Sequence, residues 1–127
     1  MYTNVVAKYA LEFAVRLGTS LGVAVPPAWS VIAAHIKIPF DAVNQRHPEY
    51  DGYAGQTIKQ ADVVLLGFPL MWPMDDTVRR NDLVYYAERT DPNGPGMFHR
   101  ECIVLGVRGG NGGGEVCVAT IAQSACC

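Results

Sequence analysis

Apolar residues near the start of the chain recur at intervals of three and four, the spacing that places side chains on one face of an α-helix. This run lies between Thr3 and Asn4, which are good N-cap residues, and Gly22, which suits the end of a helix. Its apolar positions are Val5, Val6, Tyr9, Ala10, Phe13, Ala14, Leu17 and Leu21. The pattern therefore predicts a long first helix with one apolar face.

A second helix is predicted over residues 28–36. Pro27 is well placed near its first turn, because the N–H group that proline lacks would have no partner there in any case. We expect this helix to bury Trp29, Ile32 and Ala33, and we expect Pro39 to end it.

The middle of the chain combines a long loop, an ambiguous apolar run and a third helix. Residues 40–56 have no helical period and contain many turn-forming residues, so we expect an ordered loop, and loops of this length usually carry function. The run at residues 63–67 is compatible with a buried strand or a buried helical turn, and its propensity favours the strand. A clearer helix follows at residues 77–88, with Asp75 or Asp76 as its N-cap. The side chains that this helix is expected to turn mainly to solvent are Arg79, Arg80, Asp82 and Glu88.

The composition changes after residue 97. Glycines fill most of residues 109–114, and every cysteine of the chain falls in this last part, as Cys102, Cys117, Cys126 and Cys127. The cysteine spacing matches no common zinc motif, so we interpret these residues as ordinary thiols and expect no metal and no cofactor. We predict that residues 98–127 form a divergent, disordered tail that is irregular and rich in glycine and cysteine.

The overall composition is that of a globular chain. Half of the 127 residues are hydrophobic and the net charge is −2, which suits one ordinary domain and argues against a nucleic-acid partner. No stretch approaches the roughly 18 uninterrupted apolar residues of a membrane span. Glu12 and Arg16 interrupt the first apolar run in a way that suits a helix face better than a signal peptide. We therefore expect no membrane partner, no targeting segment and a cytoplasmic location.

The densest chemistry beside apolar surface lies at residues 58–69. Here Lys59, Gln60 and Asp62 stand directly before an apolar run. An ammonium group donates hydrogen bonds and an amide both donates and accepts them, so Lys59 and Gln60 together can hold several hydroxyl groups of one ligand. From the residues alone, a solvated helix start in which Asp62 caps or pairs locally explains the same pattern.

Five short stretches between residues 2 and 97 stand in a recognisable order and spacing. They are YTN at 2–4, KIPFD at 37–41, HPEYDGY at 47–53, KQADVVLLG at 59–67 and PNGP at 92–95. In these stretches the chain resembles the family 65 glycoside hydrolases, in their acid-trehalase-like branch. The resemblance covers residues 1–97 and stops where the composition changes.

This resemblance implies an all-α fold in which residues 1–97 are part of an (α/α)6 barrel, and it implies that residues 63–67 form a short helix. It also implies that Lys59 and Gln60 hydrogen-bond the hydroxyl groups of the glucosyl unit that is cleaved off. The implied reaction is inverting hydrolysis of an α-glucosidic bond, in which one carboxylic acid protonates the leaving oxygen and one carboxylate activates water. The implied substrate is a small carbohydrate or a glycosylated hydroxylysine, either glucosyl-galactosyl-hydroxylysine or a trehalose-like sugar.

Neither catalytic carboxylate of the family is expected in this chain, so we name no catalytic residue. In the family the general acid precedes the YTN stretch, and the general base follows the PNGP stretch in sequence that this chain replaces. We therefore expect a truncated, alternatively spliced or frame-shifted product that is inactive by itself. The alternative function is that of a non-catalytic isoform, a weak sugar-binding or protein-interaction fragment that uses exposed apolar helix faces.

The remaining polar and aromatic residues have ordinary structural explanations. His35 and His47 have no visible partner carboxylate, so we expect packing or surface roles. Glu49 and Asp51 could imitate an acid/base pair, but two carboxylates in a long loop are usually solvated. Trp72 lies near the expected sugar site and could stack on a sugar ring, or it could simply pack in the core.

Overall fold

The computed structural model describes residues 1–94 and contains four helices in that range: α1 (Tyr2–Ser20), α2 (Ala28–His35), α3 (Val64–Gly67) and α4 (Asp76–Ala87). The predicted tail at residues 98–127 and its cysteines lie outside the described residues. Within residues 1–94 there is no strand, and extended backbone pairs only at two isolated bridges. The all-α prediction is confirmed for this part of the chain, whereas the (α/α)6 barrel stays a prediction.

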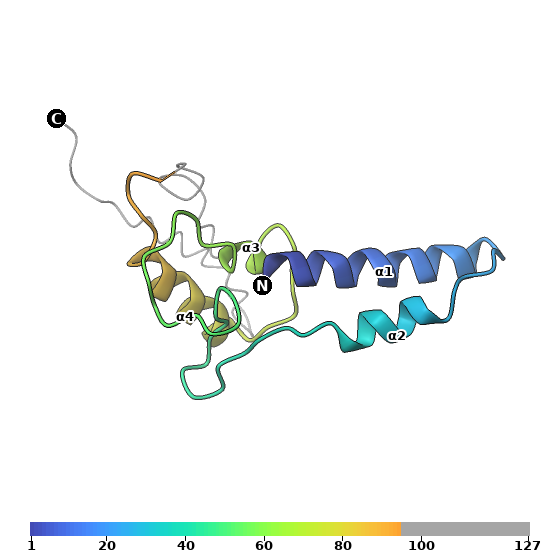
Figure 1. Ribbon diagram of the computed structural model, residues 1–127, viewed down its shortest axis with the longest axis horizontal. Coiled ribbons are helices and arrows are strands. Elements are labelled where there is room, and N and C mark those ends of the chain that lie inside the picture. The colour runs from blue at the N-terminus through green and yellow to red at the C-terminus, as the bar shows by residue number, and fades with distance from the viewer. Residues whose placement is uncertain (95–127) are drawn as a thin grey trace, which may run out of the picture.

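Helices α1 and α2 form a hairpin that projects from the rest of the molecule (Figure 1). The first helix ends as predicted, because Gly22 takes a φ of 67°, in the left-handed region that favours glycine. It begins at Tyr2 without a side-chain cap, so the predicted N-caps Thr3 and Asn4 were wrong. Asn4 instead donates a hydrogen bond from Nδ2 to the carbonyl of Lys37 at 2.7 Å, which ties the helix to the loop after α2.

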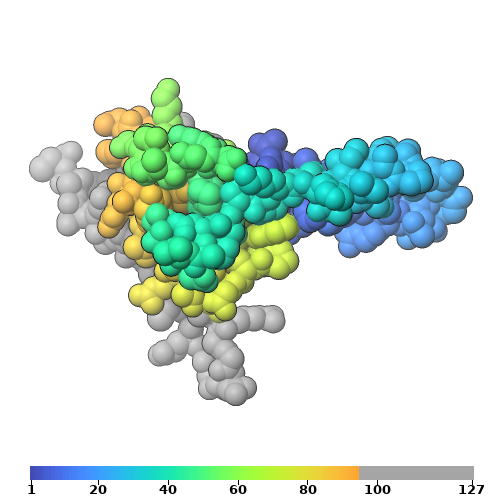
Figure 2. All heavy atoms as spheres, turned by 60° about the horizontal axis from the view of Figure 1, so that its bottom comes forward, coloured from blue at the N-terminus to red at the C-terminus, as the bar shows by residue number. Residues whose placement is uncertain are grey.

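The apolar face of this hairpin is largely uncovered by the described residues. Figure 2 shows the hairpin as a narrow arm that stands away from the body of the molecule. Phe13 and Leu17 are 57% and 45% exposed. Trp29 and Ile32, which the sequence predicted to be buried, are exposed, and Ala33 is the only one of the three predicted residues that is buried. The periodicity predicts which residues share one face of α1, but it carries no information on which neighbour covers that face.

The core lies where the start of α1 meets α3 and α4. Its residues are almost completely shielded from solvent: Val5, Ala61, Val63, Leu66 and Tyr86. The preference for a strand at residues 63–67 was wrong, and the short helix implied by the family resemblance is confirmed. A short run gains no hydrogen bonds as a strand without a partner, whereas one helical turn closes its own bonds, such as Leu66 N to Val63 O at 3.0 Å.

Helix α4 begins as predicted, with Asp75 as the N-cap. Its Oδ1 accepts a hydrogen bond from the backbone N–H of Thr77 at 2.7 Å. The buried face of the helix contains Val78, Asp82 and Tyr86, which are spaced at intervals of four. The prediction that Asp82 faces solvent was wrong, since it is 3% exposed.

The loop between α2 and α3 is fastened to α4 through Tyr85. The guanidinium carbons of Arg46 and Arg89 lie 3.6 and 3.8 Å from the centre of the Tyr85 ring, a distance at which cation–π attraction acts. Tyr53 from the same loop meets Tyr85 edge to face, with ring centres 6.4 Å apart. The expected ordered loop at residues 40–56 is therefore confirmed, because its aromatic and cationic side chains pack on the helix.

Candidate functional site

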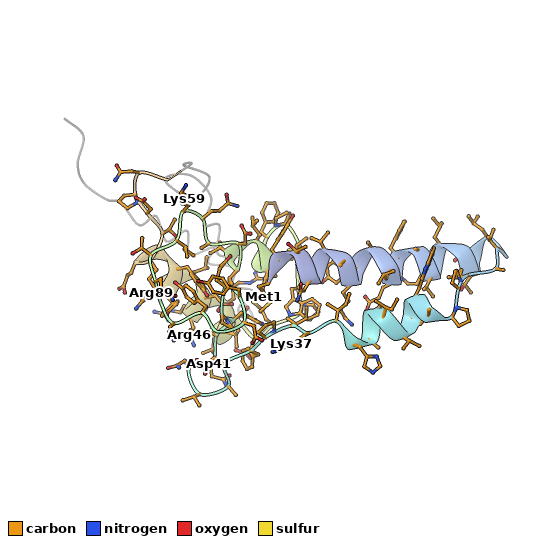
Figure 3. All side chains as sticks on the ribbon, in the orientation of Figure 1. Met1, Lys37, Asp41, Arg46, Lys59 and Arg89 are labelled. Atoms are coloured by element: carbon orange, nitrogen blue, oxygen red, sulfur yellow. The ribbon has the colours of Figure 1, made fainter. Side chains whose placement is uncertain are left out.

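Lys59 and Gln60 lie on the loop that leads into α3. Figure 3 shows Lys59 on the same side of the molecule as Arg89 and away from the tip of the hairpin. Backbone pairing holds this loop against the end of α4. Ile58 N–H donates to the carbonyl of Arg89 at 2.9 Å, and the N–H of Asp91 donates to the carbonyl of Ile58 at 2.7 Å. The residue before Lys59 is thus fixed to the chain more than thirty positions later.

The turn at residues 91–94 packs directly on the backbone of Lys59. A Cβ atom added to Gly94 would lie 2.6 Å from the carbonyl oxygen of Lys59 and 3.0 Å from that of Asp91. Only glycine fits this approach without displacing backbone. Gly94 of the PNGP stretch therefore meets the KQADVVLLG stretch at Lys59, although the two stretches that carry the family resemblance are distant in the sequence.

Gln60 is oriented by Asp62. Its Nε2 donates a hydrogen bond to Asp62 Oδ1 at 2.7 Å. Because a carboxylate only accepts hydrogen bonds, the amide nitrogen must face Asp62, and the amide oxygen Oε1 must point the other way. Among residues 1–94, neither Oε1 of Gln60 nor Nζ of the exposed Lys59 has a hydrogen-bond partner. The two adjacent residues thus offer one acceptor and one cationic donor.

Glu49 holds the backbone of the same loop at Asp62 and Val63. Its side chain is 9% exposed, and its two carboxyl oxygens accept from the N–H of Asp62 at 3.0 Å and from the N–H of Val63 at 3.2 Å. These are N–H groups at the start of α3, which a helix leaves without intrahelical partners. Burial raises the pKa of the Glu49 carboxyl above its ordinary value, against the lowering effect of these two hydrogen bonds.

Glu49 and Asp51 do not form an acid/base pair. While Glu49 turns inward to the start of α3, Asp51 is exposed and pairs with Lys37, with Oδ2 and Nζ 2.8 Å apart. The sequence did not identify Glu49 as a cap, because the peptide groups that it binds lie more than ten residues further along the chain.

The expectation that His47 lacks a partner carboxylate was wrong. Its backbone N–H and its ring Nδ1 lie 2.7 and 2.8 Å from the two carboxyl oxygens of Asp82, and both residues are buried. The hydroxyl group of Tyr86 donates to the carbonyl of His47 at 2.9 Å. This network fastens the start of the HPEYDGY stretch to α4, two residues before Glu49. His35 is exposed, and its Nδ1 lies 2.8 Å from the carbonyl of Val31.

The groove between α1 and α2 is separate from Lys59 and Gln60. A groove of about 710 Å³ lies between α1 and α2, and neither Lys59 nor Gln60 lines it. Trp72 is partly buried against the core and packs on Tyr9, with ring centres 5.8 Å apart.

Within residues 1–94, no three potential metal-ligating side chains gather. In the same range, no helix has the length and hydropathy to cross a membrane.

Known relatives cover about three quarters of the chain. Protein-glucosylgalactosylhydroxylysine glucosidase of Danio rerio is 57% identical over 98 residues, which are 76% of this chain and 15% of the relative. The protein of the same name from Gallus gallus is 55% identical over 97 residues, 76% of this chain and 14% of the relative. The periplasmic/secreted acid trehalase of Candida glabrata is 41% identical over 102 residues, 77% of this chain and 8% of the relative. No family model matches the chain.

This similarity defines the matched part of the chain as glycoside hydrolase sequence. Over about three quarters of its length the chain is similar to the acid-trehalase-like branch of the glycoside hydrolases, as the five stretches indicated. It spans about 15% of the length of the glucosidases that it matches.

The relatives contradict the expected cytoplasmic location. The acid trehalase of Candida glabrata is named as periplasmic or secreted, and that of Arthroderma benhamiae as a cell wall enzyme. That expectation depended on the absence of a signal peptide, and it was wrong.

Proposed function

We propose that this chain is part of a glycoside hydrolase that cleaves an α-glucosidic bond, with Lys59 and Gln60 holding the hydroxyl groups of the glucosyl ring. The observation that carries this proposal is the pair itself: a cationic donor and an oriented amide stand on adjacent residues of a loop that is anchored on both sides. Relatives named as glucosidases and trehalases support the same conclusion.

The chemistry of the pair suits a sugar ring. Neighbouring hydroxyl groups of glucose each donate and accept hydrogen bonds, so an ammonium group beside an amide oxygen can satisfy two of them at once. Hydrogen bonds that involve a charged group contribute about 1.5–3 kcal/mol. Lys59 would therefore supply more of the binding free energy, and Gln60 would supply more of the directional preference.

The proposed reaction is inverting hydrolysis, in which an acid protonates the leaving oxygen and a base activates water on the opposite face. We assign both carboxylates to parts of the protein outside residues 1–97. The two most buried carboxylates among the described residues support this assignment, since Glu49 caps α3 and Asp82 binds His47. Neither group has an oxygen free of structural hydrogen bonds.

The substrate that we propose is glucosyl-galactosyl-hydroxylysine, because relatives named for that glucosidase are 46–57% identical to this chain. The acid trehalases are less similar, at 41% or below. A trehalose-like disaccharide is therefore the second substrate to test.

A chimaeric enzyme tests the proposal. The 98 matched residues of the Danio rerio glucosidase are replaced by the matching residues of this chain, and kcat/KM is measured with glucosyl-galactosyl-hydroxylysine. We expect the chimaera to be active, and we expect Lys59→Ala and Gln60→Ala to lower kcat/KM by roughly 10- to 150-fold and 3- to 10-fold, from the hydrogen bonds that each removes.

The control is Arg80→Ala, which removes an exposed cation of α4 and should leave kcat/KM within about twofold. A folded chimaera without activity would refute the hydrolase function of this segment. An active chimaera in which Lys59→Ala behaves like Arg80→Ala would refute the assignment of the sugar-binding pair.

The second candidate function is that of a non-catalytic isoform that binds sugar weakly or associates with another protein chain. The exposed apolar side chains of the hairpin, such as Phe13 and Leu17, favour it. Self-association or capture of a partner that depends on Phe13, together with an inactive chimaera, would support this candidate over the first.

A further inference from the structure

We propose that Asp62 is a positioning residue that fixes the amide of Gln60 with its oxygen turned toward the sugar. This inference rests on the proposed function. It assigns a role to Asp62, a carboxylate that would otherwise be explained as a local cap near the start of α3. The hydrogen bond from Gln60 Nε2 to Asp62 Oδ1, at 2.7 Å, carries it.

Without Asp62, the amide of Gln60 could present either its nitrogen or its oxygen to a ligand, because the two ends have the same shape. A carboxylate accepts hydrogen bonds and donates none, so it selects one of these two orientations. The selected orientation leaves the acceptor Oε1 free of Asp62, on the residue next to Lys59, whose ammonium group only donates. The pair then matches two neighbouring hydroxyl groups, one that donates and one that accepts.

Asp62 can do this because its own backbone is held. The N–H of Asp62 donates to Glu49 Oε1 at 3.0 Å, and the next N–H, of Val63, donates to Glu49 Oε2 at 3.2 Å. Val63 is 1% exposed and fills the core directly after this turn. Glu49 and the core thus fix Asp62, and Asp62 in turn fixes Gln60.

The binding experiment uses the full 127-residue chain and methyl α-D-glucopyranoside, followed by NMR titration. We expect Asp62→Ala to weaken binding roughly three- to tenfold, the loss of one hydrogen bond, and Asp62→Asn to retain most of the affinity because its amide oxygen still accepts from Gln60. In a chain that already carries Gln60→Ala, Asp62→Ala should have no further effect. Equal losses with and without Gln60 would overturn the positioning role.

A second measurement reads the hydrogen bond without any ligand. One Nε2 proton of Gln60, the one that Asp62 accepts, should resonate further downfield in the natural chain, and in Asp62→Ala it should return to the position of a solvated glutamine amide. Unchanged signals in Asp62→Ala would overturn the inference alone. A downfield-shifted signal combined with no binding of the glucoside, by either the natural chain or the chimaera, would overturn the proposed function and the positioning role that depends on it.

Discussion

The buried contact between His47 and Asp82 predicts a large loss of stability for Asp82→Ala. The substitution removes a carboxylate that is 3% exposed and that accepts both the backbone N–H and the ring Nδ1–H of His47. Both donors then stay in a buried position without an acceptor. The carbonyl of His47 still accepts from the Tyr86 hydroxyl group at 2.9 Å, so the loop cannot readily move to expose these donors to water.

The size of the loss follows from these two contacts. Each hydrogen bond to a charged group contributes about 1.5–3 kcal/mol, and each buried donor left without a partner costs about 1–3 kcal/mol. The lost hydrogen bond and the unpartnered donor are two descriptions of the same loss, so their free energies are not added. Water can also reach part of the space that the side chain leaves, so we expect a total loss of about 2–4 kcal/mol. If the free energy of unfolding falls by about 1.5 kcal/mol per molar of urea, the midpoint of unfolding should fall by roughly 1.3–2.7 M.

Urea unfolding of the 127-residue chain, followed by circular dichroism, measures this shift. Asp76→Ala is the control, because Asp76 is exposed in the first turn of the same helix and should cost less than about 1 kcal/mol. Combining Asp82→Ala with His47→Ala isolates the side-chain bond, since the backbone N–H of residue 47 stays in place. A loss no larger than that of Asp76→Ala, or strictly additive single losses, would refute the reasoning.

Two further predictions concern the loop between α2 and α3. Gly55→Ala should cost about 2 kcal/mol or more, because its φ of 95° is strained for alanine and the new Cβ would lie 2.9 Å from the Tyr85 hydroxyl oxygen. Gly52→Ala, with a φ of 83° and open space around it, should cost only about 1–2 kcal/mol. Thermal unfolding compares them, and equal losses would contradict the proposed clash. Burial raises the pKa of Glu49, so the folded chain binds this proton more tightly than the unfolded chain. The stability of the natural chain relative to Glu49→Gln should therefore rise as the pH falls from the neutral range through the raised pKa of Glu49. A flat or opposite pH dependence of that difference would contradict the raised pKa.

The sequence predicted local structure well wherever one residue type decides it. Gly22 ends α1 because glycine readily takes a positive φ, and Asp75 begins α4 because its side chain reaches an N–H two residues away. Both signals act within a few residues, so both can be read without the fold. The prediction of Thr3 and Asn4 as N-caps failed because it also used only local sequence. Nothing near Asn4 in the sequence shows that its side chain binds a carbonyl 33 residues away.

The candidate site could be predicted only in part. The pair Lys59 and Gln60 is proposed from its chemistry and from the family resemblance, whereas the residues that hold its loop in place were not predicted. Asp82 was expected to face solvent and His47 to lack a carboxylate, because residues 35 positions apart give no sign in the sequence that they will meet. Buried polar contacts of this kind depend on tertiary packing, which overrides the usual preference of aspartate for the surface.

The anchoring of the site loop also predicts how strongly this chain can bind sugar. The loop is held through Glu49 and the Ile58 backbone, which meets the need to place hydroxyl-binding groups with little freedom. Lys59 is nevertheless exposed, and water competes for an exposed donor, so each hydrogen bond contributes little beyond the one that it replaces. The 127-residue chain should therefore bind methyl α-glucoside on the order of millimolar or more weakly. The same pair in the chimaera, where more of the enzyme excludes water, should bind more tightly, and equal affinities in the two settings would show that the loop alone makes the sugar site.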